Sequence, residues 1–107
     1  MAIREAPEKI FKSLGDSVRI RIFELLMSSS LPLTMNEVAD RFDISRQAVA
    51  RHLMVLRESG LVDLIKRGRE RYCHPNPRPL LKAEAWMLRF TGDRTGTAGR
   101  TSSTRQD

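Results

Sequence analysis

The stretch that decides the fold is DISRQAVARHLMVLRESGLVDLIKRGRERY, residues 43–72. Its first part has the pattern of an amphipathic helix, with apolar residues recurring every three or four positions. Ser45 is a good helix N-cap because its hydroxyl oxygen can accept a bond from a free backbone N–H. Ser59-Gly60 stops the pattern, since Gly readily adopts the left-handed conformation that ends helices. We therefore expect a helix from Ser45 to about Glu58.

The second part of the stretch predicts a β-hairpin. An apolar run over residues 61–65 is followed by Lys66-Arg67-Gly68-Arg69, a turn with Gly at its tip, and by a returning run over 70–74. Residues 41–72 contain eight Lys or Arg and four acids. A solvated basic surface would explain that excess, but its concentration in a helix followed by a hairpin favours a nucleic-acid partner.

The flanking sequence predicts more helices. The expected elements are helices over 7–14, 18–27, 35–42 and 78–90, with a loop over 28–33. Asp16 or Ser17 should cap the second helix, and Thr34 with Glu37 has the spacing of a capping box. Arg19 and Arg21 should point away from the apolar face of the second helix. The result is a mainly α-helical fold with a small β-hairpin: a winged helix-turn-helix, four helices, two strands and a last helix.

The helix after Ser45 has two faces of different character. Val49, Leu53 and Leu56 share one face, which predicts that they anchor the helix to the core. The polar face can enter a DNA major groove, where Arg pairs with guanine and Gln with adenine. An ordinary surface helix is the alternative, and a charged edge that prevents sheet aggregation is the alternative for the hairpin. The predicted DNA-binding residues are Ser45, Arg46, Gln47, Ala50, Arg51, His52, Lys66, Arg67 and Arg69.

Composition is compatible with this interpretation. The chain has 107 residues, a net charge of +6 and a pI near 10.4, which favours a polyanion partner. It has no apolar run of the roughly 20 residues that span a bilayer, so we expect a cytoplasmic protein with no membrane partner. Residues 1–90 should form one domain. Residues 91–107 lack apolar periodicity and are predicted to be a disordered tail.

The chain resembles the winged-helix repressors of the ArsR/SmtB family. The matching segments are IFKSLGDSVRIRIFELL and TMNEVADRFDISRQAVARHLMVLRESGLVDLIKRGRERYCHPNP, and with the last helix they cover residues 6–90. One departure is Ser17, where such proteins often have Pro at the start of the second helix; Ser is also a good starter. The resemblance implies a homodimer in which two reading helices address a palindromic operator.

The resemblance also implies that the first and last helices form the dimer interface. Independent support comes from the apolar load of the last helix, because an exposed patch of that kind usually marks a partner surface. Packing of this helix on its own core is the alternative. The predicted interface residues are Ile10, Phe11, Leu81, Ala85, Trp86 and Leu88.

Many family members sense metals, but the residues here do not predict a metal site or any other cofactor. The predicted third helix has no Cys or His, and the last helix has no Asp or His. Cys73 and His74 are adjacent on a strand, so their side chains should point to opposite faces. Cys73 is the single cysteine and is interpreted as a small hydrophobe, with a redox role as the alternative.

The sequence is compatible with three functions of unequal support. The leading one is a dimeric, sequence-specific transcriptional repressor that binds double-stranded DNA without a metal. The second is a winged helix that binds another protein, which would need an acidic or apolar reading face instead of this basic one. An enzyme has little support, since the chain lacks a recognisable catalytic triad or phosphate loop. The sequence does not identify the operator, the regulated genes or the inducing signal. A small organic effector is compatible with it.

Overall fold

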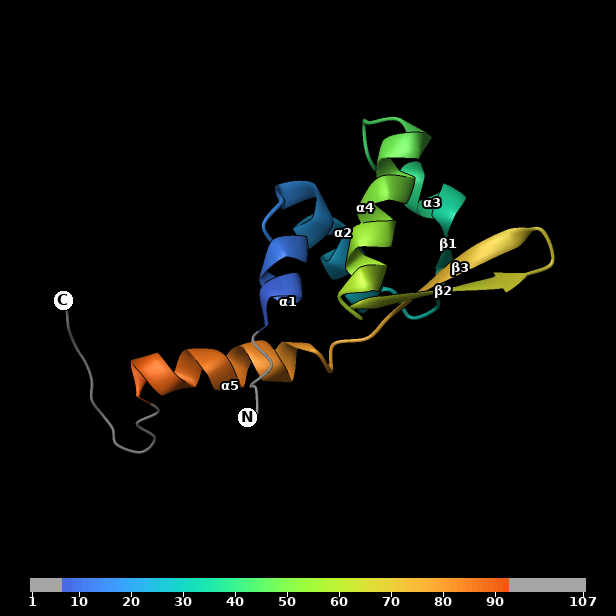
Figure 1. Ribbon diagram of the computed structural model, residues 1–107. Coiled ribbons are helices and arrows are strands. Elements are labelled where there is room, and N and C mark those ends of the chain that lie inside the picture. Colours follow the sequence, from blue (N-terminus) through green and yellow to red (C-terminus); the bar gives the residue numbers. More distant parts are fainter. Residues whose placement is uncertain (1–6, 93–107) are drawn as a thin grey trace.

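The computed structural model describes residues 7–92. In chain order the elements are α1 (Glu8–Ser13), α2 (Ser17–Ser28), β1 (Leu33–Thr34), α3 (Met35–Ala39), α4 (Arg46–Glu58), β2 (Val62–Arg67), β3 (Glu70–Pro75) and α5 (Leu80–Thr91). The predicted winged helix-turn-helix is confirmed: the helices gather on one side, and the β2–β3 hairpin projects from them as the wing (Figure 1).

The expected helix caps form. Asp16 caps α2 by accepting from the backbone N–H groups of Val18 and Arg19 at 2.8 and 3.2 Å. The backbone N–H of Arg19 lowers the pKa of the Asp16 carboxyl, because hydrogen bonds to its charged form favour that form. Thr34 and Glu37 make the predicted capping box at the start of α3. The Ser45 hydroxyl accepts from the backbone N–H of Ala48 at 3.0 Å and so starts α4 where the sequence indicated.

Two predictions around α3 were wrong in detail. Leu33 was assigned to a loop, but Leu33–Thr34 is a strand that pairs with β3 opposite Cys73 and Tyr72, so the sheet has the order β1-β3-β2. Two residues are too few to show the alternation by which strands are recognised. The helix α3 ends at Ala39 instead of residue 42, because the next amides of Arg41 and Phe42 bond to carbonyls only three residues back.

The hairpin is longer, and its turn tighter, than the sequence indicated. Lys66 and Arg67 belong to β2, and only Gly68 and Arg69 form the turn. Gly68 has a φ of +64°, a conformation that a two-residue hairpin turn requires and that Gly adopts without steric cost. The basic residues therefore extend along a regular strand instead of lying in a loose loop.

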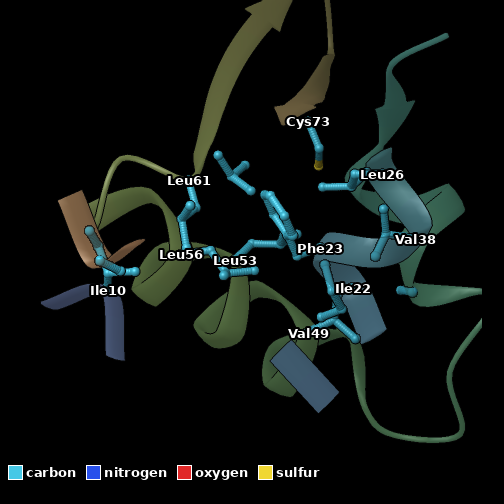
Figure 2. Packing of buried hydrophobic residues seen from close by; sticks show 13 residues of the cluster. Ile10, Ile22, Phe23, Leu26, Val38, Val49, Leu53, Leu56, Leu61 and Cys73 are labelled. Carbon is cyan, nitrogen blue, oxygen red and sulfur yellow. The ribbon is translucent and has the colours of Figure 1, made fainter. Parts of the chain in front are cut away.

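The core lies between α2, α4 and the base of the sheet (Figure 2). As predicted, Val49, Leu53 and Leu56 turn the apolar face of α4 inward and are at most 1% exposed. They meet Ile22 and Leu26 of α2, among other buried side chains. Leu61, Val62 and Cys73 complete the core from the sheet side, so the wing is rooted in the same packing that holds α4.

The last helix, α5, begins and ends later than expected. Residues Arg78 and Pro79 form the turn that precedes Leu80, and the helix continues to Thr91. Gly92 ends it in the left-handed conformation, with its N–H bonded to the Leu88 carbonyl at 2.9 Å. The predicted tail therefore starts at least two residues too early, and the rest of it, 93–107, lies outside the described residues. In Figure 1 α5 runs past α1, away from the wing.

Candidate nucleic-acid interface

The polar face of α4 is open. Arg46, Gln47 and Arg51 are exposed, and Ala50 is half-buried between them. Ser45 is exposed at the N-cap, where its hydroxyl oxygen is already occupied by the Ala48 N–H. The helix thus presents its first two turns to solvent while its opposite face is locked in the core. Such an element can lie in a DNA groove without losing its own packing.

Arg46 is oriented by the neighbouring helix. Its Nη1 donates to Oδ1 of Asn36 at 2.6 Å, and its Nη2 donates to Oδ1 of Asp40 at 3.2 Å. The Arg46 and Asp40 side chains are 61% and 67% exposed, and an ion pair so open to water adds little stability. Its effect is on orientation, since it fixes a long flexible side chain at the start of α4. The sequence alone had indicated no role for Asn36 or Asp40.

His52 faces inward, unlike the other predicted readers. It is half-buried, and Nη1 of Arg19 donates to its Nδ1 at 3.1 Å. The expectation that Arg19 points away was wrong: its side chain is 16% exposed and also donates to the carbonyls of Ser13 and Lys12. No local pattern could reveal this pair, because 33 residues separate its members. A DNA contact by His52 stays a prediction, but the imidazole has a partner inside the protein.

The wing adds a row of cations. Lys66, Arg67 and Arg69 are exposed, as expected. In the register of the hairpin Lys66 lies opposite Arg71, whereas Arg67 lies opposite Glu70. Like charges in directly opposed positions destabilise a sheet. A polyanion between these two cations would remove that cost, so the Lys66–Arg71 pair suits a phosphate backbone.

The helix α4 and the wing share one hollow of about 380 Å³. From the helices it is lined by Asn36, Arg46, Gln47 and Ala50, among others, and from the wing by Arg69, Glu70 and Arg71. The structure thus brings together predicted residues that are 19 to 23 positions apart in the sequence. Arg71 was counted among the basic residues of the hairpin but not among the predicted DNA-binding residues, and Asn36 and Glu70 of the lining were not predicted either.

Comparison with known proteins agrees with this geometry. A helix-turn-helix domain family matches residues 14–65. The arsenical resistance operon repressor of Escherichia coli is 34% identical over 87 residues, which are 75% of this chain and 72% of that protein. A crystal structure of an ArsR family transcriptional regulator superposes with a TM-score of 0.72 at 30% identity, covering 78% of this chain and 90% of that one. The chain belongs to the ArsR family. It is therefore a transcriptional regulator with a helix-turn-helix DNA-binding domain.

A second solved structure supports the fold of this ArsR-family chain. It is a homodimeric winged helix-turn-helix DNA-binding domain from Mycobacterium bovis, described as a possible ArsR-family transcriptional regulator. The TM-score is 0.62 at 16% identity, and the match covers 96% of this chain and all of that one. These relatives are named as regulators and not as enzymes. Within residues 7–92 no helix is long and apolar enough to cross a membrane.

The chemistry of Cys73 bears on what this ArsR-family protein could sense. The side chain is fully buried on β3, opposite Leu33 of one neighbouring strand and Leu64 of the other. Burial raises the pKa of the thiol to about 11, so the reactive thiolate is scarce near neutral pH. His74 follows it and is half-buried. Among the residues that the structure covers, no group of three or more His, Cys, Asp or Glu side chains could hold a metal ion.

The outer surface of α5 is apolar over most of its length. Leu81, Trp86, Leu88 and Phe90 are between 37% and 67% exposed, and of the helix only Ala83 is buried. The Trp86 ring packs edge to face on Phe11 of α1 and on Phe90. Ala85 is exposed, as an interface would require. Ile10 is the exception among the predicted interface residues: at 5% exposure it lies in the core of its own protomer and has little surface for a partner.

Proposed function

We propose that this ArsR-family regulator is a homodimeric repressor that binds a palindromic operator, and that it does so without a metal. The observation that carries the proposal is the shared hollow, where Arg46 and Gln47 of α4 face Arg69 and Arg71 of the wing. A groove-reading helix beside a cationic hairpin matches what a duplex offers, base edges in the groove and phosphates along its rim.

Within this proposal the two elements have different tasks. Arg46, Gln47, Ala50 and Arg51 read base edges in the major groove, because the N-terminal turns of a recognition helix lie closest to the bases. The exposed cations of the wing bind phosphates or the adjacent minor groove, which carry little sequence information but much of the affinity. Those wing residues are Lys66, Arg67, Arg69 and Arg71. Ser45 can contact a phosphate at the start of α4.

The dimer is supported by the surface of α5. A soluble monomer rarely exposes so many large apolar side chains on one short helix, where Leu81, Trp86 and Leu88 are 62%, 37% and 41% exposed. The structural relative from Mycobacterium bovis is described as homodimeric, which supports the same assembly here. Phe11 borders the patch from α1 and is 38% exposed. Two-fold pairing of these surfaces would give the two reading helices the symmetry of a palindrome.

Independence from metal is supported by the state of Cys73. A thiol ligand must be deprotonated to bind a metal, and this thiol is buried with a pKa raised to about 11. The regulator would act in the cytoplasm, beside the operator it controls. A small organic effector that ends repression is compatible with this function.

Selection of bound fragments from genomic DNA, followed by band shifts in the presence of a chelator, tests the proposal. The expected result is enrichment of a short inverted repeat, unchanged by the chelator, with two chains per duplex by mass measurement. Leu88→Glu should abolish the two-chain complex, because it places a charge in the apolar face of α5. Leu31→Glu is the matched control, since Leu31 is 72% exposed and lies outside α5.

Each part of the proposal can fail separately. Loss of binding with the chelator would contradict metal independence. Equal effects of the two Glu substitutions would contradict the α5 interface. Selection without any enriched sequence would exclude an operator-binding repressor and favour the alternative of a protein-binding winged helix.

A further inference from the structure

The reading helix α4 is attached to the α1–α2 corner by a polar contact in its middle. Arg19 of α2 directs two of its guanidinium nitrogens at α1: Nε donates to the Ser13 carbonyl at 2.7 Å, and Nη2 donates to the Lys12 carbonyl at 3.2 Å. The third nitrogen, Nη1, donates to Nδ1 of His52 on α4 at 3.1 Å. One side chain therefore joins three helices, and its planar fork fixes their relative directions.

A second polar contact attaches the C-terminal end of α4. The Ser59 hydroxyl lies 3.0 Å from the hydroxyl of Ser13, which itself donates to the Ile10 carbonyl at 2.9 Å. Ser59 is then the donor to Ser13, and it shares its proton with the Leu56 carbonyl, also at 3.0 Å. Ser13 is 1% exposed, so its hydroxyl cannot exchange these partners for water without a large cost. Both attachments end on the same residue, because the Ser13 carbonyl also receives the Arg19 bond.

The distance between the two attachments determines how they orient α4. His52 and Ser59 are seven residues apart, so they lie on one face of the helix, about 10 Å apart along its axis. Two fixed points at that separation set both the tilt of α4 and its rotation about its own axis. Apolar packing already holds α4 against the core but is not directional, so the two polar attachments add a defined direction to it.

The α1–α2 corner also contacts helix α5, which we call the arm. Phe11 of α1 packs edge to face on Trp86 of α5, with ring centroids 5.4 Å apart. Phe11 and Ser13 are two residues apart, so α1 contacts the arm with one and the reading helix with the other. A rigid chain of contacts thus leads from α5 through α1 and Arg19 to His52.

We infer that four positioning residues fix the direction of α4 and thereby set the spacing between operator half-sites that the protein binds. They are Arg19, His52, Ser13 and Ser59. The inference rests on the proposed dimer on a palindromic operator. If α5 forms the two-fold interface, the direction of α4 relative to α5 fixes where the two reading helices meet the duplex. One inserted base pair moves a half-site by about 3.4 Å and turns it by roughly 35°. An anchored helix cannot follow that change, whereas a loosened one can.

The test measures spacing discrimination, which we define as the affinity for the selected operator divided by that for operators with one base pair added or removed between half-sites. The wild type is expected to discriminate by about tenfold or more, within the usual cost of a misplaced contact. His52→Leu and Arg19→Lys should reduce the ratio to about threefold or less, a loss of the same order as that of one hydrogen bond. His52→Asn should restore most of it, because the Asn oxygen can accept where Nδ1 does.

Two further variants separate positioning from general stability. Ser59→Ala removes the other attachment with a minimal change of volume, and it should also lower the ratio. Arg21→Lys is the matched control for Arg19→Lys: Arg21 is exposed on the same helix, and its substitution should leave the ratio unchanged. Thermal unfolding of each variant shows whether it is folded at the assay temperature. A variant that loses affinity equally for all spacings would point to a merely structural role.

The outcomes distinguish this inference from the function it rests on. A wild type without spacing preference would overturn the dimeric operator binding itself. A wild-type preference that Arg19→Lys, His52→Leu and Ser59→Ala all retain would overturn only the positioning role. A double-mutant cycle of Arg19 and His52 in urea, without DNA, should show a coupling of about tenfold in the folding constant, and no coupling would contradict the anchor.

Discussion

Phe11 and Trp86 pack edge to face at an angle of 65°, and this contact is a main link between α1 and α5. Trp86 also meets Phe90 at 4.9 Å, so three aromatic rings form a short ladder along the arm. Aromatic pairs of this geometry contribute about 1 kcal/mol beyond the area that they bury. The ladder thus holds the arm where its apolar face stays open to a partner.

The ladder provides a direct optical test, because Trp86 is the only tryptophan in the chain. Phe11→Ala should shift its fluorescence emission to longer wavelength and weaken association, since the indole loses a ring that shields it. Steady-state emission and sedimentation measure the two effects. Leu31→Ala, an apolar truncation outside α1 and α5, should change neither. Unchanged emission in Phe11→Ala would contradict the packing of α5 on α1.

A second prediction concerns Arg46, whose two partners on and after α3 orient it at the start of α4. Arg46→Ala should weaken operator binding by about tenfold or more, because a good Arg–base contact contributes about 1–3 kcal/mol. Stability should change by less than about 0.5 kcal/mol, since the ion pair with Asp40 is exposed. Competition band shifts and urea unfolding measure these two quantities.

The control for Arg46 is Arg57→Ala. Arg57 is exposed in the last turn of the same helix, far from the turns proposed to read DNA. Its removal should lower affinity only slightly and equally on operator and random DNA. If Arg57→Ala and Arg46→Ala caused the same loss, the assignment of the N-terminal turns as readers would be wrong.

A third prediction concerns the wing. Arg67→Ala and Arg69→Ala should weaken binding to all sequences alike and reduce the slope of log affinity against log salt by about 0.9 for each phosphate that is no longer neutralised. Titration with operator and random duplexes at several salt concentrations gives both numbers. Arg78→Ala, an exposed arginine outside the wing, should leave the slope unchanged. A weakening confined to the operator would instead indicate base reading by the wing.

Much of this architecture was predictable because its signals are local. The caps at Asp16, Thr34 and Ser45 bond to amides two or three residues away, and the apolar face of α4 repeats with the helical period. The strand Leu33–Thr34 was not predictable for the opposite reason. It is defined by its pairing with β3, about 40 residues later, and its own sequence carries no alternation.

The candidate site likewise has one part that local sequence predicts and another that it does not. The exposure of the proposed readers Gln47 and Arg51 follows from the helical period, and the wing cations follow from composition. The partners that orient them do not, because Arg46 meets Asn36 and His52 meets Arg19 only when helices pack. Arg19 was expected to point away from the other helices because it lies off the apolar face of α2. Its three guanidinium nitrogens donate to the Ser13 and Lys12 carbonyls and to Nδ1 of His52, which offsets the loss of water.

The last pair of predictions concerns Cys73, beginning with a redox role. In the native protein at pH 7 the thiol should react with a thiol reagent far more slowly than in urea, because it is fully buried and its pKa is raised to about 11. The ratio of the two labelling rates measures this protection. Native labelling as fast as in urea would contradict the burial and reopen the redox alternative.

The raised pKa also predicts how stability depends on pH. The folded protein holds the Cys73 proton more tightly than the unfolded chain, whose thiol has the ordinary value of 9.0. The contribution is therefore complete below pH 9 and is lost as pH rises towards about 11, by roughly 2 kcal/mol. Urea unfolding at pH 8 and pH 10 should show the fall in the wild type. Cys73→Ala should be less stable than the wild type at pH 8, because it leaves a small cavity. Its free energy of unfolding should fall less between pH 8 and pH 10, because it has no thiol to ionise.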